Sequence, residues 1–287
     1  MNNNINYNKI LNNVDLSMLL LDNQFNILFY NLKFCRTLDL KESDILGHNI
    51  KKIFNKTNLA IFFHKINNIS QTNTATFEIE ALKKKKCIPI QIIININYIN
   101  NKQVYFLILK DISNIKNYEY NLKQKAFYDQ LTDLPNRSLF YDRADIVLNQ
   151  AIRSNDKFAI VYIDLDGFKL INDNYGHSTG DIYLKEIAKR LLKSARSTDT
   201  VARFGGDEFA ILMPRLKSYK NAENLAKRIL KQSLIPIKIG DNNFRPKSSI
   251  GISIYPKDGD TIDKLLIKAD EAMYKAKRLG NNKYIFI

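Results

Sequence analysis

The sequence predicts an α+β protein in which two domains are joined by a helix. Its 287 residues are enough for two domains that each bury a core. In both halves, short apolar runs rich in β-branched residues alternate with segments whose apolar residues recur at helical spacing. From about residue 114 to residue 127 only the helical spacing is present. We therefore expect domains at residues 10–113 and 128–287, with a helical linker at 114–127.

The first domain is expected to contain a hairpin, short helices and three further strands. Met18 to Leu21 and Ile27 to Tyr30 flank a turn-rich link and predict the hairpin. Short amphipathic pieces follow it. The later strand-like runs are Thr76 to Ala81, Ile88 to Ile96 and Val104 to Leu109. This order resembles that of PAS sensor domains, and the segments Ile45-Leu46-Gly47 and Asp111-Ile112-Ser113 strengthen the resemblance. The resemblance does not identify the ligand of the sensor or the signal that it detects.

The linker carries one apolar stripe. Ile115, Tyr118, Leu122 and Ala126 recur at spacings of three and four, and Lys and Asn fill the positions between them. Two interpretations fit this pattern. The helix packs on its own domain, or it forms one half of a two-stranded coiled coil that joins the sensor to the second domain.

The second domain is expected to be a sheet covered by helices. The nearly unbroken apolar run from Phe158 to Ile163 predicts a strand that is buried on both faces. Helical spacing recurs around Asp142 to Arg153, Ile182 to Ala195, Ala222 to Gln232 and Ile262 to Arg278. Helices that alternate with strands in this way cover a sheet in the layered folds of mixed proteins.

Composition limits the classes of partner. The formal net charge is +15, which suits anionic ligands, but the lysines are scattered and the one dense run, Lys83 to Lys86, has the position of a hairpin turn. The sequence therefore argues against nucleic acid as the partner. No apolar run approaches the roughly 20 residues of a membrane span, and the start lacks the layout of a secretion signal, so we expect a cytoplasmic protein. Cys35 and Cys87 are too few for a disulfide framework.

Two acidic sites lie at the ends of predicted strands. Val201 to Phe204 and Phe209 to Met213 are β-prone, and the glycines of Gly205-Gly206-Asp207-Glu208 supply the positive φ that a tight turn requires. We expect a hairpin whose tip exposes both acids. Asp164 ends the buried strand. Each site alone could be an ordinary turn or strand cap, whereas together they favour a site for a magnesium-bound nucleotide.

At these residues the chain resembles the GGDEF-type diguanylate cyclases. The matching segments are Asp129 to Arg137, the Asp164 stretch, the Arg203 to Phe209 hairpin, Ser249 to Ile252 and Ala269 to Lys277. The resemblance implies a palm-like βααββαβ nucleotidyl cyclase domain. It also implies a sensor-regulated homodimer that condenses two GTP molecules into cyclic di-GMP and two pyrophosphates, with feedback inhibition by the product.

The resemblance assigns roles to individual residues. Asp164, the Leu165 carbonyl, Asp207 and Glu208 would bind Mg²⁺ or Mn²⁺, two ions in each half-site, and Asp207 and Glu208 would be catalytic, with Glu208 either a second metal ligand or a base. The residues implied to bind substrate are Phe168, Lys169, Asn172, Asp181, Gly205, Gly206 and Lys277. Among them, Asn172 and Asp181 would read guanine. Arg196 and Asp199 have the spacing of the inhibitory product site, for which a loop salt bridge is the alternative.

The chain departs from the family pattern at two positions. Asn281 stands where a second phosphate-binding arginine is usual, so either Lys283 compensates or the affinity for triphosphate is reduced. Asp133 stands where glycine is usual, and Asp tolerates positive φ better than most residues. Asp129 and Arg137 are expected to be structural and to pair with each other. Because of Asn281, a second hypothesis stays open, in which the protein is a catalytically inactive receptor for cyclic di-GMP.

Overall fold

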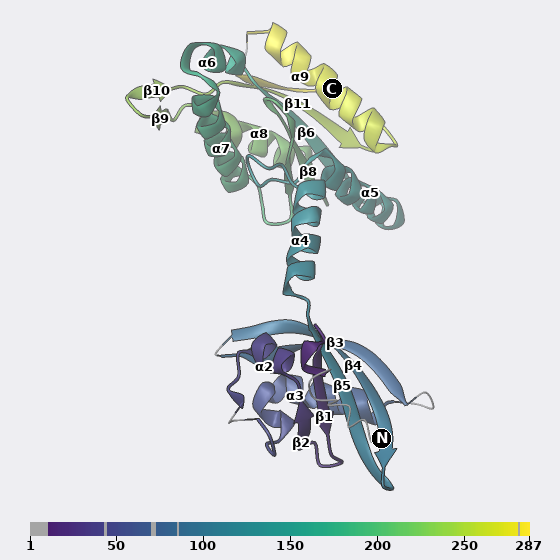
Figure 1. Cartoon of the computed structure of the whole chain (residues 1–287). Helices are drawn as coiled ribbons and strands as arrows, with labels where there is room; N and C mark the ends of the chain where they lie inside the picture. The colour runs from purple at the N-terminus through teal and green to yellow at the C-terminus, as the bar shows by residue number, and fades with distance from the viewer. Residues whose placement is uncertain (1–10, 43–44, 70–72, 85, 281) are drawn as a thin grey trace. The chain divides into compact units, whose positions relative to one another are not determined.

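A computed structural model describes residues 11–42, 45–69, 73–84, 86–280 and 282–287 (Figure 1). The chain divides into two compact units between Tyr120 and Asn121, inside helix α4 (Ser113–Phe127). Helix α4 confirms the prediction, made from the apolar spacing, that the linker is helical. None of its residues is buried, and Ile115, Tyr118 and Leu122 of the apolar stripe are exposed. The stripe is therefore not packed on the described parts of its own chain.

The first unit is an antiparallel sheet with helices packed against it. Its strands are β1 (Ser17–Leu21), β2 (Ile27–Tyr30), β3 (Thr74–Lys83), β4 (Lys86–Ile99) and β5 (Lys102–Asp111). They lie in the order β2-β1-β5-β4-β3. Between β2 and β3 come α2 (Leu32–Leu38), the 3₁₀ helix η2 (Ile50–Ile53) and α3 (Lys56–Asn67). Alternate residues of β3, namely Phe77, Ile79 and Ala81, point into the core. The predicted order of strands and helices is confirmed, as is the hairpin that joins β3 to β4.

The second unit is a five-stranded sheet covered on both faces. Its strands are β6 (Phe158–Leu165), β7 (Thr200–Gly205), β8 (Glu208–Met213), β11 (Ser248–Tyr255) and β12 (Lys283–Phe286), in the order β12-β11-β6-β8-β7. Its longer helices are α5 (Arg137–Ser154), α7 (His177–Ser194), α8 (Tyr219–Ser233) and α9 (Ile262–Arg278). Every residue of β6 is buried, as predicted. From β6 to β11 the main elements follow the order βααββαβ (Figure 1).

Each face of this sheet has its own core. Val161, Ile163 and Leu165 of β6 pack with residues of α7 and α8. Phe158, Ile160 and Tyr162, which alternate with them, pack with residues of α5 and α9. Alternation places Asp164 on the face that α5 and α9 cover.

The residue patterns did not locate several short elements of the second unit, the first of which is one of the two consecutive helices that the resemblance implied. They are α6 (Phe168–Tyr175), β9 (Ile237–Ile239), β10 (Asn242–Phe244) and β12. Helix α6 is short and contains Asn172-Asp173-Asn174, residues whose side chains favour turns over helices. Strand β12 forms by parallel pairing with β11, a contact that local sequence does not encode.

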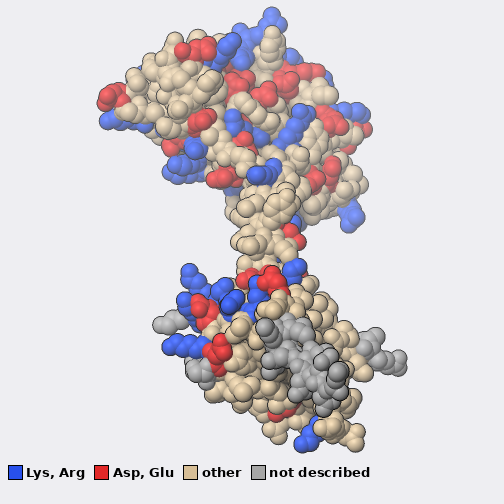
Figure 2. Space-filling model, in the orientation of Figure 1, with Lys and Arg blue, Asp and Glu red and all other residues tan. Residues whose placement is uncertain are grey.

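Charged residues are spread over the surface. On the face of the second unit shown in Figure 2, Lys and Arg are interspersed with Asp and Glu. None of the described helices is long and apolar enough to cross a membrane.

Candidate functional site

Strand pairing brings the predicted acids together at one end of β6. Asp164 and Glu208 are direct partners across the β6 and β8 ladder. The β7 and β8 hairpin is confirmed, with φ of 143° at Gly205 and 52° at Gly206. The Leu165 amide donates to the Asp207 carbonyl at 3.2 Å, so the tip of the hairpin is attached to the end of β6.

The prediction that the tip exposes its acids was wrong. Asp207 and Glu208 are half-buried, and Asp164 is only 8% exposed, because the hairpin tip lies against the end of β6. Burial raises the pKa of both Asp207 and Glu208, and the nearby Asp164 carboxylate raises each pKa further. Crowded carboxylate oxygens are a donor set that suits Mg²⁺ or Mn²⁺, since a cation would offset their repulsion. The residues present therefore fit a divalent metal.

Lys277 already neutralises one of these acids. Its Nζ, in the last turn of α9, donates to Asp164 Oδ1 at 2.7 Å. Burial would lower the pKa of the Lys277 ammonium, but the hydrogen bond and the negative charge of Asp164 outweigh that effect and raise it. Within the described residues, no three His, Cys, Asp or Glu side chains are arranged around one metal position. The carboxylates are thus close together, and the Lys277 ammonium is bonded to Asp164.

The residues expected to read the base lie on α6 and α7. Asn172 Oδ1 is buried and has no hydrogen-bond partner among the described residues. A Cβ at Gly180 would collide with this oxygen, so any larger residue there would force the Asn172 side chain out of its present position. Asp181, the next residue, is exposed. A buried acceptor without a partner is costly, and a ligand's donor would satisfy it.

Phe168 and Lys169 begin α6 and differ in their surroundings. The Phe168 side chain is buried, and its ring stacks on Tyr183 with centroids 6.1 Å apart. Only the main chain of Phe168 is therefore left for a triphosphate. Lys169 is exposed and its ammonium is accessible from solvent.

Arg203 is a site residue that we did not predict. Its Nη1 donates to both Asp129 carboxylate oxygens, at 3.0 and 3.1 Å, while Nε and Nη2 donate to the Gly206 carbonyl at 3.0 and 2.7 Å. The expected pairing of Asp129 with Arg137 was wrong, since the Arg137 guanidinium lies over the ring of Phe204, 5.6 Å from its centroid. The signal was present in the sequence, because an arginine, whose guanidinium can donate several hydrogen bonds at once, lies two residues before the Gly-Gly pair.

Asp166 is a second residue of the site that we did not predict. It accepts from Ser249 Oγ at 2.8 Å and from the Asn282 amide at 3.2 Å, so it joins the end of β6 to β11 and to the loop before β12. Asn281 lies outside the described residues. Lys283, which we considered as its substitute, donates from Nζ to the Leu279 carbonyl.

The predicted product site is a turn between α7 and β7. The Arg196 amide donates to Asp199 Oδ2 at 2.8 Å, and the Asp199 amide donates to the Arg196 carbonyl at 3.0 Å. Burial raises the pKa of Asp199. Among the described ion pairs there is none between the two side chains, and the Arg196 side chain is exposed. Asp199 therefore shapes the turn and leaves the guanidinium free to meet a ligand.

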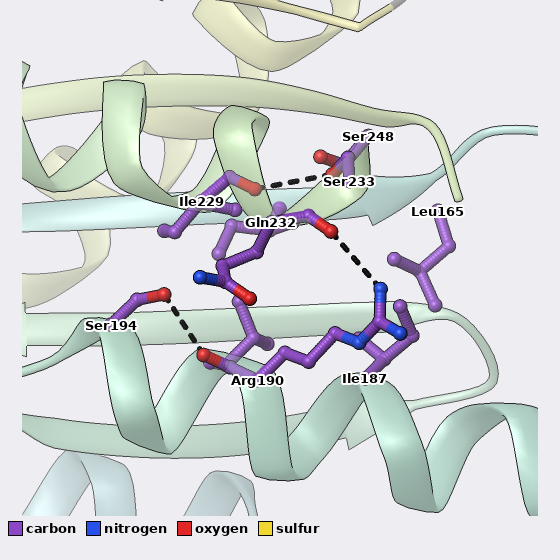
Figure 3. A pocket seen from close by; sticks show the side chains of 10 residues that line it. Leu165, Ile187, Arg190, Ser194, Ile229, Gln232, Ser233 and Ser248 are labelled. Atoms are coloured by element: carbon purple, nitrogen blue, oxygen red, sulfur yellow. Dashed lines mark hydrogen bonds between the residues drawn. The ribbon is translucent and has the colours of Figure 1, made fainter. Parts of the chain in front are cut away.

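The end of α7 is fixed by bonds to α8 (Figure 3). Arg190 donates from Nη1 to the Gln232 carbonyl at 3.0 Å. Arg228 donates from Nε and Nη2 to the Ser194 carbonyl at 3.0 and 2.9 Å. A largely apolar cavity of about 20 Å³ lies between these helices and β6. These contacts hold the turn that carries Arg196 at a fixed place in the domain.

A positive backbone angle explains the remaining departure from the pattern. Asp133 has φ of 57°, so the turn does require the left-handed region there. Asp occupies that region more readily than most residues do.

A βααββαβ sheet with crowded carboxylates at the end of its central strand defines a palm-type nucleotidyl cyclase domain. Residues 126–283 match the family described as "Diguanylate cyclase, GGDEF domain", and residues 15–114 match the PAS domain family. The chain belongs to the GGDEF family and carries a PAS domain in front of the GGDEF domain.

Related proteins agree with this assignment. The chain is 46% identical over 165 residues to the bifunctional diguanylate cyclase/cyclic di-GMP phosphodiesterase MucR of Pseudomonas aeruginosa, a match that covers 58% of this chain and 24% of MucR. The GGDEF domain structure of TpbB from the same species is 41% identical, with a TM-score of 0.54, and the match covers 55% of this chain and 93% of that one.

A third relative was solved with a nucleotide. The coiled coil and GGDEF domain of DgcB from Caulobacter crescentus, in complex with c-di-GMP, is 27% identical with a TM-score of 0.56, over 61% of this chain and 93% of that one. Among the curated relatives, the chain spans only 24% of the length of MucR and 37% of that of TpbB. What these proteins share with it is therefore mainly the GGDEF domain.

Proposed function

We propose that this protein is a sensor-regulated diguanylate cyclase that condenses two GTP molecules into cyclic di-GMP and two pyrophosphates. The observation that carries the proposal is the pairing of Asp164 with Glu208 across β6 and β8, with Asp207 at the adjoining hairpin tip. All three acids of the family's site are present. Mg²⁺ or Mn²⁺ held by them and by the Leu165 carbonyl would neutralise the charge that develops on the phosphate oxygens.

The remaining residues position the nucleotide. Asn172 and Asp181 would bind the guanine edge, since an amide and a carboxylate complement its donors and acceptor. The Gly205 and Gly206 amides, with no side chain in the way, would face the phosphates. Lys277 would leave Asp164 for the triphosphate when the metal arrives. Each of these contacts orients GTP without taking part in bond breaking.

The reaction needs two copies of the chain. One domain holds one GTP, and each 3′-hydroxyl must attack the α-phosphate of the opposite nucleotide while pyrophosphate leaves. A homodimer brings the two half-sites together, and the exposed stripe of α4 provides apolar surface for a coiled coil between the copies.

Turnover tests the proposal directly. Protein incubated with GTP and Mg²⁺ is expected to yield cyclic di-GMP and pyrophosphate in a ratio of one to two, and Asp207→Asn is expected to abolish both. Asp263→Asn is the matched control, because Asp263 is an exposed acid that bonds to Tyr141. A wild-type protein that makes no cyclic di-GMP, or an Asp207→Asn variant with unchanged turnover, would contradict the assignment.

Feedback by the product is a further part of the proposal. The exposed Arg196 side chain beside Asp199 suits a guanine or phosphate edge, and the complex of DgcB shows that a GGDEF relative binds c-di-GMP. Added cyclic di-GMP is expected to slow the wild type but not Arg196→Ala. Equal inhibition of both proteins would exclude this turn as the site.

A receptor without catalysis is the second candidate function. It is favoured by Asn281, which replaces the expected arginine, and by Lys277, which is engaged by Asp164. Calorimetry separates the two candidates: tight binding of cyclic di-GMP with no turnover of GTP supports the receptor, and turnover excludes it.

A further inference from the structure

Tyr162 lies on the same face of the sheet as the catalytic acids. Asp164 is paired with Glu208, and Tyr162, two residues before Asp164, is paired with Ala210. Side chains two residues apart in a strand share a face, so Tyr162 is the diagonal neighbour of Glu208. The Tyr162 hydroxyl donates to Glu208 Oε2 at 3.2 Å.

The Tyr162 ring is held by its neighbours. Its partner Ala210 is small and leaves room for it, and the Phe204 ring contacts it edge to face with centroids 5.6 Å apart. Phe204 occupies the irregular step between Arg203 and Gly205, and it is packed against Phe140 with centroids 5.1 Å apart. Tyr162 is 9% exposed. The position of its hydroxyl is therefore fixed by the packing of the ring and not by contact with solvent.

Glu208 lies in a cluster of carboxylates. Asp164, Asp207 and Asp270 are close enough for their negative charges to repel that of Glu208. In the hydrogen bonds of the described residues, Tyr162 is the side-chain donor to Glu208. A phenol is protonated at neutral pH, so the Tyr162 hydroxyl can donate to the Glu208 carboxylate.

We propose that Tyr162 is a positioning residue for the cyclase reaction. Its hydroxyl holds Oε2 of Glu208, so that Oε1 is left to face the metal and the attacking hydroxyl. The inference rests on the proposed function, because it assigns a role within the same site. The competing explanation is that Tyr162 only fills space between β6, β7 and the helices α5 and α9.

A hydroxyl deletion separates these explanations. Tyr162→Phe keeps the ring and removes the donor. Tyr141→Phe is the matched control, because Tyr141 lines the same groove of about 310 Å³ between α5 and α9 but donates to Asp263, at 2.9 Å. We expect Tyr162→Phe to lower kcat about tenfold, the lower end for a hydrogen bond to a charged group, with KM for GTP within about twofold. Tyr141→Phe is expected to leave both constants within about twofold.

Each result decides the question. An unchanged kcat in Tyr162→Phe, or equal losses in both variants, would overturn the proposal in favour of packing. A loss of kcat confined to Tyr162→Phe supports it.

If the wild type makes no product, the proposed function fails on its own, and Mn²⁺ binding measured by electron paramagnetic resonance decides the role of Tyr162. Weaker Mn²⁺ binding by Tyr162→Phe than by Tyr141→Phe then upholds the positioning role. Equal binding by the two variants overturns it.

Discussion

The pair formed by Arg203 and Asp129 should stabilise the second unit measurably. The side chains are 10% and 21% exposed, and the guanidinium also donates twice to the Gly206 carbonyl. Breaking a buried ion pair costs about 3–5 kcal/mol. Because Asp129 is partly solvated, we expect Asp129→Asn and Arg203→Lys each to lower the free energy of unfolding by about 2–3 kcal/mol, which is at or below the lower limit of that range. For a domain of this size that is a fall in Tm of about 4–12 °C.

A double-mutant cycle measures how much of this loss belongs to the pair. Urea unfolding of the wild type, both single variants and the double variant should give a coupling free energy above about 1.5 kcal/mol. The control is the same cycle on Glu223 and Lys227, a more exposed pair of α8 that should give a coupling free energy under about 0.5 kcal/mol. A coupling no larger than that of the control would refute the reasoning.

The same pair should make stability sensitive to acid. Burial alone would raise the Asp129 pKa, but hydrogen bonds from Thr132 and Arg203 outweigh it, so the pKa is lowered. A lowered pKa means that this contribution is present above the unfolded value of about 3.9 and is lost as the pH falls through the folded value. The difference between the wild type and Asp129→Asn should therefore shrink below about pH 4.

Three further predictions concern the site. Glu208→Gln should raise the Tm of the metal-free protein at pH 7, because burial and the neighbouring negative charges raise the pKa of Glu208. Scanning calorimetry should show that this gain in Tm shrinks as the pH falls to about 4, where Glu208 is protonated in both the folded and the unfolded state. Gly180→Ala should raise KM for GTP and lower Tm, since its Cβ would collide with Asn172; an unchanged KM would contradict this. Asp133→Ala should cost about 1 kcal/mol in urea unfolding at its φ of 57°, while Asp133→Gly should not be less stable than the wild type.

The sequence predicts those elements whose signal is local. The apolar run of β6 and the alternation of β3 to β5 depend on which residues face a core, and the hairpin tip depends on two glycines. The residue patterns did not locate helix α6 or strand β12, because other parts of the chain stabilise them: α6 packs on α7 at Gly180, and β12 pairs with β11. Such contacts are absent from any short window of sequence.

For the site, the sequence identifies acids but not their surroundings. The motif places Asp207 and Glu208 next to each other, yet their burial follows from the packing of the hairpin against β6. The partner of Asp129 is Arg203, 74 residues away in the chain, and the hydroxyl near Glu208 comes from Tyr162, 46 residues away. Side chains so distant in sequence meet only because strand register fixes them.

Strand register also explains why the end of β6 can lose its bond to Lys277 and still keep its position. Asp164 bonds to Lys277, the Leu165 amide bonds to the Asp207 carbonyl, and Asp166 bonds to Ser249. Three successive residues are thus attached to α9, to the hairpin tip and to β11. If Lys277 leaves Asp164 for a triphosphate, the other two attachments still hold the strand end, so the carboxylate becomes available to a metal while its backbone stays where it is. Binding energy is then not spent on rebuilding the site.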